Sequence, residues 1–486
     1  MAGHPNILIF MTDHQRRETM PGYGWCKTPN LERFAREAVQ FDGAACPSPH
    51  CCPSRASFFS GLYPSDHGVW NNVDVGNTLS RGLAEGVRLW SEDLRDAGYR
   101  LFYSGKWHVS AEEGPQDRGF ELLHGRTDYH RFRRVPDTHG WALYQSRPMS
   151  DPARSRRDGE ILRSGYPEYF LYGDSENPFN DRQTVDAALS CLRDLAADGG
   201  GAPWCLYVGV TGPHDPYCVP QRFLDLYDPA DIRLPASFDD DLLDKPALYR
   251  RTRRPYEQLT REEHREALRH YLAFCSYEDA LFGEVLDVLH ATDQDNGTVV
   301  MYLSDHGDYA GAHGLWAKGL PCFREAYSIP LMIRAPGCAA HRVDAPVSLT
   351  DLAPTILELA DVPARRRFAG FSLAPYLRGE PDAPRRRWQF TQTNGNEVYG
   401  IQRSVSDGQW KYVFNGFDFD ELYDLQNDPD ELHNLADDAR YAPVIRRMCR
   451  ALWRFAKENN DNIVNPYIMT ALAPYGPGIL ADPGEE

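Results

Sequence analysis

Three apolar runs of strand length, each followed at once by polar residues, constrain the fold of this chain more than any other feature. They cover residues 6–11, 204–210 and 298–303, and short bounded runs of this kind are typical of strands buried in a sheet. A further strand is predicted at residues 100–104, and helices are predicted at residues 28–39, 53–60, 87–97, 186–197, 263–290 and 349–359. Strands that alternate with helices favour a mostly parallel sheet covered on both faces.

The sequence changes character after the arginine-rich stretch 381–387. Short predicted strands, separated by turn-forming Asn, Asp and Gly residues, follow at 388–393, 397–405, 410–414 and 421–425. A helix is predicted over residues 442–459, and the end of the chain is rich in Pro, Gly and Ala. We therefore predict an α/β fold with a large, mostly parallel mixed sheet flanked by helices in residues 1–384. Residues 385–486 are predicted to form a smaller C-terminal α+β subdomain, a small antiparallel sheet with a helix and a tail.

The net charge and the cysteine content limit the possible binding partners and the cellular compartment of the protein. The net charge of −18 argues against nucleic acid or an anionic membrane as a partner. No apolar run reaches the length of a membrane span, and residues 6–11 are too short for the core of a signal peptide. The eleven cysteines are odd in number and irregularly spaced, which argues against a disulfide framework and for a reducing compartment. We predict a cytoplasmic protein and leave a homo-oligomer open.

Arginines crowd into one segment, residues 118–163, against this acidic background. The segment contains Arg118, Arg126, Arg131, Arg133, Arg134, Arg147, Arg154, Arg156, Arg157 and Arg163. Two interpretations stay open: a solvated loop surface, or a wall that attracts an anionic substrate.

The three apolar runs end in residues suited to a metal. Asp13 follows the first run, His214 the second, and Asp305 with His306 the third. In open α/β sheets ligands bind beyond the carboxyl ends of the strands, so these distant segments are expected to converge on one site. Each aspartate alone would most often be a turn or cap residue. Two carboxylates and an imidazole together suit a divalent cation, and hard oxygen ligands favour calcium or magnesium.

A pentapeptide with two cysteines precedes a predicted helix; it reads Cys51-Cys52-Pro53-Ser54-Arg55. Cys51 has a proline two residues on and an arginine four residues on, whereas Cys52 has a serine and an alanine at those offsets. Taken alone, the pattern also fits a buried cysteine before a helix that starts with proline.

In their order along the chain these elements resemble the sulfatase family of the alkaline phosphatase superfamily. The resemblance runs from about residue 5 to residue 437, and residues 421–436 look like the family's C-terminal sequence. The matching residues are Asp13, Cys51, Pro53, Ser54, Arg55, Lys106, His108, His214, Asp305, His306, Gly307 and Lys318. The resemblance implies an alkaline phosphatase-like fold and hydrolysis of a sulfate monoester to an alcohol and inorganic sulfate. Sulfated sugars, aryl sulfates and small alkyl sulfates all stay open as substrates.

The resemblance also implies cofactors and a partner in maturation. Cys51 matches the cysteine that a formylglycine-generating enzyme converts to formylglycine. The implied metal is calcium, with magnesium or manganese as alternatives, and its implied ligands are Asp13, Cys51, Asp305 and His306. His14 stands where many members have a second aspartate, and His306 where many have Asn or Gln. His14 is therefore left open as a ligand.

The family mechanism implies how the sulfate is attacked. The aldehyde at Cys51 is hydrated, and the cation lowers the pKa of one of its hydroxyls, which attacks the sulfur. Asp305 assists that deprotonation. Lys106 and Lys318 neutralise the sulfonate oxygens together with the cation.

Other residues are implied to position groups or move protons. Arg55 holds the formylglycine loop rather than touching the substrate. His214 protonates the departing alkoxide, and His108 is the base when the second hydroxyl expels sulfate. The family often has an asparagine near the site, and Asn72 is favoured over Asn71 for this position.

Two other functions stay open. The nearer one is a phosphonate monoester or phosphodiester hydrolase on the same scaffold, a branch that replaces the Lys-x-His pair with uncharged residues. This chain keeps Lys106 and His108, which favours sulfate monoesters. The more distant alternative is a non-catalytic anion-binding relative in which Cys51 stays a thiol.

Overall fold

The computed structural model describes residues 4–481 except 76–77, 128–147, 152–154, 200, 397, 466, 469–471 and 473. Five members of the arginine-rich segment therefore lie outside the described residues: Arg131, Arg133, Arg134, Arg147 and Arg154. Within the described ranges, no helix combines the length and the apolar character needed to cross a membrane.

An eight-stranded sheet with the order β10-β2-β9-β8-β1-β6-β3-β4 lies at the centre of the molecule. β9 is antiparallel to both of its neighbours, and the other neighbouring pairs are parallel. The strands are β1 (Asn6–Thr12), β2 (Val39–Ala45), β3 (Arg100–Gly105), β4 (Glu121–His124), β6 (Trp204–Gly209), β8 (Thr298–Ser304), β9 (Leu331–Arg334) and β10 (His341–Ser348). The predicted α/β fold with a mostly parallel mixed sheet is confirmed. A separate pair, β5 (Tyr172–Asp174) and β7 (Tyr217–Val219), is also parallel.

The central strand β1 explains why the sheet has helices on both faces. Successive side chains of a strand point to opposite faces. Ile7, Ile9 and Met11 belong to one buried apolar cluster, whereas Leu8 and Phe10 belong to a second cluster on the other face. Both faces must therefore be covered, as expected for a parallel sheet.

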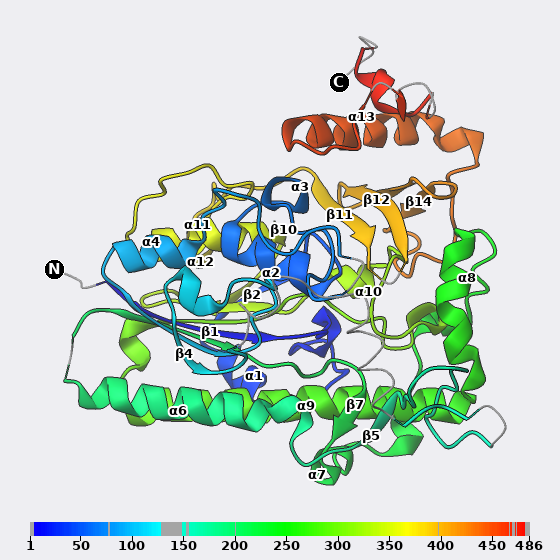
Figure 1. Ribbon diagram of the computed structural model, residues 1–486. Helices are drawn as coiled ribbons and strands as arrows, with labels where there is room; N and C mark the ends of the chain where they lie inside the picture. The colour runs from blue at the N-terminus through cyan, green and yellow to red at the C-terminus, as the bar shows by residue number, and fades with distance from the viewer. Residues whose placement is uncertain are drawn as a thin grey trace.

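Helices cover each face of this sheet (Figure 1). The first cluster packs against α2 (Cys51–Ser60), α4 (Trp90–Asp96), α11 (Leu352–Leu359) and α12 (Ala374–Leu377). The second packs against α1 (Pro29–Phe34), α6 (Asp181–Ala197) and α9 (Arg261–Ala291). The shorter helices are α3 (Pro64–His67), α7 (Gln221–Leu224), α8 (Ala247–Arg253) and α10 (Arg324–Tyr327).

Several predicted helices have different limits in the structure, and two of these differences have a physical explanation. The helix expected over 28–39 ends at Phe34, because Val39 and Phe41 are buried in β2, a strand that the sequence pattern did not reveal. The helix expected from Pro53 begins at Cys51. Proline has no N–H to donate, but N–H groups in the first turn of a helix need no intrahelical partner. Pro53 therefore fits inside the first turn and does not mark its start.

The C-terminal part contains the predicted small antiparallel sheet. Its order is β11-β12-β13-β14, with β11 (Gln389–Gly395), β12 (Tyr399–Ser406), β13 (Trp410–Asn415) and β14 (Glu421–Asp424). Helix α13 (Ala442–Glu458) packs on this sheet through a third apolar cluster (Figure 1). β11 also contacts the loop that leads into α2, since the Gln392 N–H donates to the Pro47 carbonyl over 2.8 Å. The domain limits 1–384 and 385–486 stay a prediction.

Gly105→Ala should destabilise the junction of β3 and β6. Gly105 has φ +101°, and an added Cβ would collide with the Gly209 carbonyl oxygen of the neighbouring strand. Overpacking and left-handed strain together predict a loss of about 3 kcal/mol in the free energy of unfolding, measured by urea titration. Gly201→Ala is the control, because nothing lies within 4 Å of its added Cβ. Equal losses in the two variants would contradict this explanation.

Candidate active site

The carboxyl ends of neighbouring parallel strands bring the predicted site residues together. Asp13 follows β1, Asp305 follows β8, and Lys106 follows β3. The loop after β6 carries His214, and its Gly212 carbonyl accepts a 3.1 Å hydrogen bond from the Asp13 N–H. Segments far apart in sequence thus meet at one edge of the sheet, as predicted from the strand ends.

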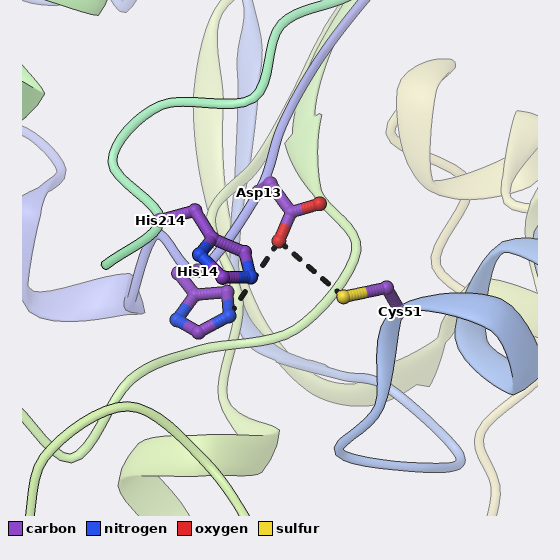
Figure 2. A group of neighbouring side chains, drawn as sticks. All are labelled: Asp13, His14, Cys51 and His214. Carbon is purple, nitrogen blue, oxygen red and sulfur yellow. Dashed lines mark hydrogen bonds and ion pairs between the residues drawn. The ribbon is translucent and has the colours of Figure 1, made fainter. Parts of the chain in front are cut away.

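Cys51 lies at the first turn of α2 and faces this edge. Its Sγ is 3.6 Å from Asp13 Oδ1 and 3.3 Å from His306 Nε2. Figure 2 shows the Asp13 carboxylate between the Cys51 sulfur and the His14 ring, with His214 beside His14. Cys51 is 1% exposed, so a group at residue 51 meets this pocket and little solvent.

Arg55 forms buried ion pairs with both carboxylates. Its NH2 group is 3.0 Å from Asp13 Oδ2, and its Nε is 2.8 Å from Asp305 Oδ2. All three side chains are fully buried. The arginine also donates to the Lys106 carbonyl and to the Tyr207 hydroxyl, each over 3.1 Å. Arg55 is therefore fully engaged with protein groups and holds α2 against the strand ends.

Two lysines flank residue 51. Lys106 Nζ is paired with Asp13 Oδ2. Lys318 Nζ contacts His14 Nε2 and lies 3.1 Å from His214 Nε2. Burial would lower the pKa of Lys318, but Cys51, Asp13 and other negative groups raise it overall. Lys318 is therefore a cation in the folded protein.

His14 is held as a neutral ring. Burial, with nearby His214 and Lys318, places its pKa well below the usual value. Its Nδ1 lies 2.8 Å from Asp308 Oδ2, and its Nε2 is 3.7 Å from Asp13 Oδ1. A neutral imidazole with Nε2 towards Lys318 accepts a hydrogen bond from that ammonium. His14 thus orients Lys318.

His108 and Asn72 lie beside the second cysteine. His108 Nε2 is 3.0 Å from Asp74 Oδ1. Burial would lower its pKa, but Cys52 and Asp74 raise it well above the ordinary value. The Asn72 side-chain oxygen accepts a 3.2 Å hydrogen bond from the Cys52 N–H, so Asn72 contacts the start of α2.

The donor atoms fit a divalent cation. One atom each from Asp13, Cys51, Asp305 and His306 lie within 4.8 Å of one another, and all four residues are buried. A second such group joins His14 and His214 to Asp13 and Cys51. Burial would raise the pKa of Asp13, yet Lys106 and Arg55 hold it well below the usual range. Asp13 therefore offers an ionised oxygen, the kind of donor that hard cations prefer.

The sequence pattern missed several residues that hold these groups. Asp308 orients His14 and accepts from the Tyr217 hydroxyl over 2.8 Å. Asp74 pairs with His108, and Asp215 Oδ1 lies 3.2 Å from His214 Nδ1. Each of these aspartates lies within two or three residues of an identified motif, which was the available signal. Conversely, His313, near Lys318 in sequence, is a core residue that pairs with Asp240.

A buried carboxyl pair supports the loop that carries His214. Asp181 accepts hydrogen bonds from the N–H groups of Thr211 and Gly212, each 2.8 Å long. Glu278 of α9 packs against the same Gly212. Burial raises the pKa of Asp181 to about 7, and burial with the nearby Asp181 raises that of Glu278. The pair therefore holds a proton at a pH where exposed carboxyls are ionised.

Comparison with known proteins places this geometry among related chains. The family model described as Sulfatase matches residues 5–362, and the model described as N-sulphoglucosamine sulphohydrolase, C-terminal, matches residues 311–458. A choline-sulfatase from Rhizobium meliloti is 31% identical over 456 residues, which cover 90% of this chain and 84% of that protein. Two solved structures share the fold. A phosphonate monoester hydrolase from Silicibacter pomeroyi has a TM-score of 0.76 and 24% identity, and the match covers 94% of this chain and 96% of that one. BT4656, solved in complex with its substrate D-glucosamine-2-N,6-O-disulfate, has a TM-score of 0.70 and 20% identity, and the match covers 94% of this chain and 99% of that one.

Glu278→Gln should weaken the pH dependence of stability. The folded protein keeps protons on Asp181 and Glu278 that the unfolded chain releases near about pH 4. The free energy of unfolding of the wild type therefore falls as pH rises through about 7. An amide at position 278 cannot ionise. Between about pH 5 and pH 8 the free energy of unfolding of the variant should therefore fall by on the order of 2 kcal/mol less than that of the wild type. Urea unfolding measures this, and Glu284→Gln on the exposed side of α9 should keep the wild-type slope.

Proposed function

The chain belongs to the sulfatase family and is a sulfuric ester hydrolase, and on that premise we propose how its own residues hydrolyse a sulfate monoester. One observation carries the proposal. Residue 51 opens a buried helix within reach of Asp13 and His306, and two ammonium groups, Lys106 and Lys318, flank the same point. A nucleophile, a cation site and anion-neutralising groups therefore surround one position.

The nucleophile is proposed to be formylglycine made from Cys51 by a formylglycine-generating enzyme. The thiol of Cys51 occupies the place of the hydrated aldehyde in the mature protein. Cys52 is a poorer candidate, since its Sγ accepts from the Val73 N–H over 3.4 Å and lies in the first apolar cluster. Residue 51 also lies where the N–H groups and the positive end of α2 point towards an anion.

A divalent metal is proposed to be held by Asp13, Asp305, His306 and residue 51. The oxygen and imidazole donors suit calcium, with magnesium or manganese as alternatives. When bound, such a cation supplies Lewis-acid neutralisation of sulfonate oxygens and lowers the pKa of a hydroxyl beside it. Asp305 also faces the site and is proposed to accept the proton of that hydroxyl; burial and Asp13 raise its pKa.

The two lysines are proposed to bind the sulfonate oxygens. Both are half-buried ammonium groups beside anionic or acceptor partners, so their charge is fixed in place before substrate arrives. Preorganised donors of this kind act most strongly where water is excluded. Arg55 is proposed to act only through its hold on Asp13 and Asp305.

Two histidines are proposed to move protons. His214 lies at the edge of a cavity, with Nδ1 near Asp215 and Nε2 near Lys318, and would protonate the departing alkoxide. His108 is paired with Asp74 and is proposed as the base for the release of sulfate. Asn72 is proposed to fix the start of α2.

A phosphonate monoester or phosphodiester hydrolase stays the alternative, because a hydrolase of the first kind shares the fold. Lys106 and His108 argue for sulfate monoesters, and the lysine lies directly on the metal-binding carboxylate. The cytoplasmic location stays a prediction, supported by eleven cysteines of which none forms a disulfide. The oligomeric state also stays open.

Cys51→Ala should abolish sulfate ester hydrolysis, whereas Cys52→Ala should keep most of it. The first change removes the proposed nucleophile and leaves the helix start intact. Initial rates on p-nitrophenyl sulfate measure the loss. Intact mass of the wild-type peptide should show that the sulfur of Cys51 is replaced by an aldehyde oxygen. Full activity with an unmodified Cys51 would rule out the proposed nucleophile, and equal losses in the two variants would mean that the wrong cysteine was chosen.

Lys106→Thr should reduce sulfatase kcat/KM by roughly 10²–10³-fold, the effect of removing one preorganised donor. Activity on a phenyl phosphonate ester should fall less, because the proposed role of Lys106 is specific to the sulfuryl oxygens. Lys411→Thr is a matched control: it removes a buried lysine paired with Glu431, away from the site, and should keep the ratio of the two activities. A wild type that prefers diesters, or equal losses on both substrates, would favour the alternative function.

A further inference from the structure

A cavity of about 550 Å³ adjoins the site and has not been assigned a ligand. Its wall includes Lys318 and His214, which also face residue 51. If His214 protonates the leaving oxygen, as proposed above, the alcohol half of the substrate lies in this cavity. The remaining wall therefore selects the alcohol, and the inference below rests on the proposed function.

The cavity wall carries two arginines, Arg163 and Arg251, that pair with no carboxylate among the described residues. Arg163 is half-buried, and within the described residues its side chain hydrogen-bonds only to the Pro167 carbonyl, over 3.3 Å. Its Nε is buried and has no hydrogen-bond partner in the described part of the chain. A buried guanidinium N–H without a partner is costly, and an anionic ligand would satisfy it.

Arg251 of α8 is the second cation on this wall. It is exposed and makes no ion pair or hydrogen bond with any residue that the structure describes. Its neighbour Arg253 points elsewhere, to Glu257 over 3.3 Å and to the Asp240 carbonyl. Arg251 is thus available to a ligand in the cavity, whereas Arg253 is engaged with protein groups.

The wall has a single carboxylate, Asp215, among the described residues. Its Oδ2 accepts from the Tyr169 hydroxyl over 2.7 Å, and its Oδ1 lies 3.2 Å from His214 Nδ1. Asp215 is therefore occupied, and three cationic side chains face one engaged anion. The potential in the cavity is positive, against a chain of net charge −18.

A cationic alcohol such as choline fits this wall poorly. Quaternary ammonium groups bind over aromatic faces. The aromatic residues of the wall are Tyr169, Tyr256 and Trp316. The Arg163 guanidinium already covers the ring of Tyr169, 4.7 Å from its centroid, and Trp316 is 1% exposed. A second cation there would meet like charges from Arg163, Arg251 and Lys318. The 31% identity to a choline-sulfatase therefore does not extend to the charge of the leaving group.

We infer that the substrate is a sulfate ester whose alcohol carries a second anionic group, a carboxylate or a second sulfate, bound by Arg163 and Arg251. The cavity volume falls within the range of pockets that enclose ligands larger than a simple alkyl sulfate. Among the three substrate classes left open by the sequence, an acidic sulfated sugar fits best.

The test compares four sulfate esters as substrates of the mature wild-type enzyme. The esters are glucosamine-2-N,6-O-disulfate, the neutral glucose 6-sulfate and the cationic choline sulfate; a uronic acid sulfate separates a carboxylate from a sulfate as the second anion. We expect kcat/KM for an anionic ester to exceed that for glucose 6-sulfate by at least about tenfold, with choline sulfate lowest. Equal values, or a preference for choline sulfate, would overturn the inference.

Variants then assign the preference to residues. Arg163→Gln and Arg251→Gln should each lower the ratio of kcat/KM between anionic and neutral esters by about tenfold, mostly through KM. Arg163→Lys should restore part of the ratio. Arg250→Gln, a neighbour on α8 outside the cavity wall, should keep the wild-type ratio. An unchanged ratio in both glutamine variants would overturn the assignment.

The two proposals fail in different ways. Cleavage of p-nitrophenyl sulfate without any preference for anionic alcohols rejects the inference and leaves the sulfatase assignment standing. If no sulfate ester is cleaved although residue 51 is modified, the proposed function fails, and calorimetric binding still decides the inference. Wild-type protein should then bind the disulfate more tightly than choline sulfate, and the reverse order would overturn it.

Discussion

The ion pairs of Arg55 with Asp13 and Asp305 are the interaction on which the rest of the site depends. The two aspartates end neighbouring parallel strands, and both are fully buried, so without a cation between them they would repel each other in a poorly solvated place. Arg55 comes from α2, the helix that also begins with Cys51. One guanidinium therefore fixes the separation of the carboxylates and the position of residue 51 at the same time. Removing one partner from such a buried group typically costs about 3–5 kcal/mol, because it leaves an uncompensated charge.

The charges around residue 51 are arranged for an anion that arrives from outside. Lys106 and Lys318 are cations, whereas His14 is kept neutral by burial and by its cationic neighbour. A carboxylate at position 14 would neutralise Lys318. The neutral ring instead donates a hydrogen bond from Nδ1–H to Asp308 and accepts one from Lys318 at Nε2. Lys318 is therefore oriented and keeps its full charge. This difference from the commonest family pattern makes the site more attractive to negatively charged oxygens.

The sequence allowed prediction of those features that hydrophobic periodicity and sheet topology determine. Parallel strands share an edge, so Asp13, His214 and Asp305 could be expected to meet before any distance was known. β2 and β9 were missed because they are short buried strands whose composition resembles that of helix ends and loops, and β2 pairs with strands about 300 residues away in sequence. The partners of the proposed catalytic groups were missed for a related reason. Asp74 and Asp308 have no pattern of their own, and only the folded chain places them against a histidine.

The contact between β11 and the start of α2 has a consequence for the timing of maturation. Thr393 Oγ1 lies 3.4 Å from His50 Nδ1, a contact between residues 343 positions apart, and every residue of α2 is buried. In the folded protein the side chain of residue 51 is 1% exposed and therefore out of reach of a modifying enzyme. At typical synthesis rates the ribosome needs roughly 20–70 s to make the intervening chain. The proposed conversion of Cys51 must therefore take place before the nascent chain folds. Under the proposed maturation, the fraction of modified molecules is therefore set before this contact forms.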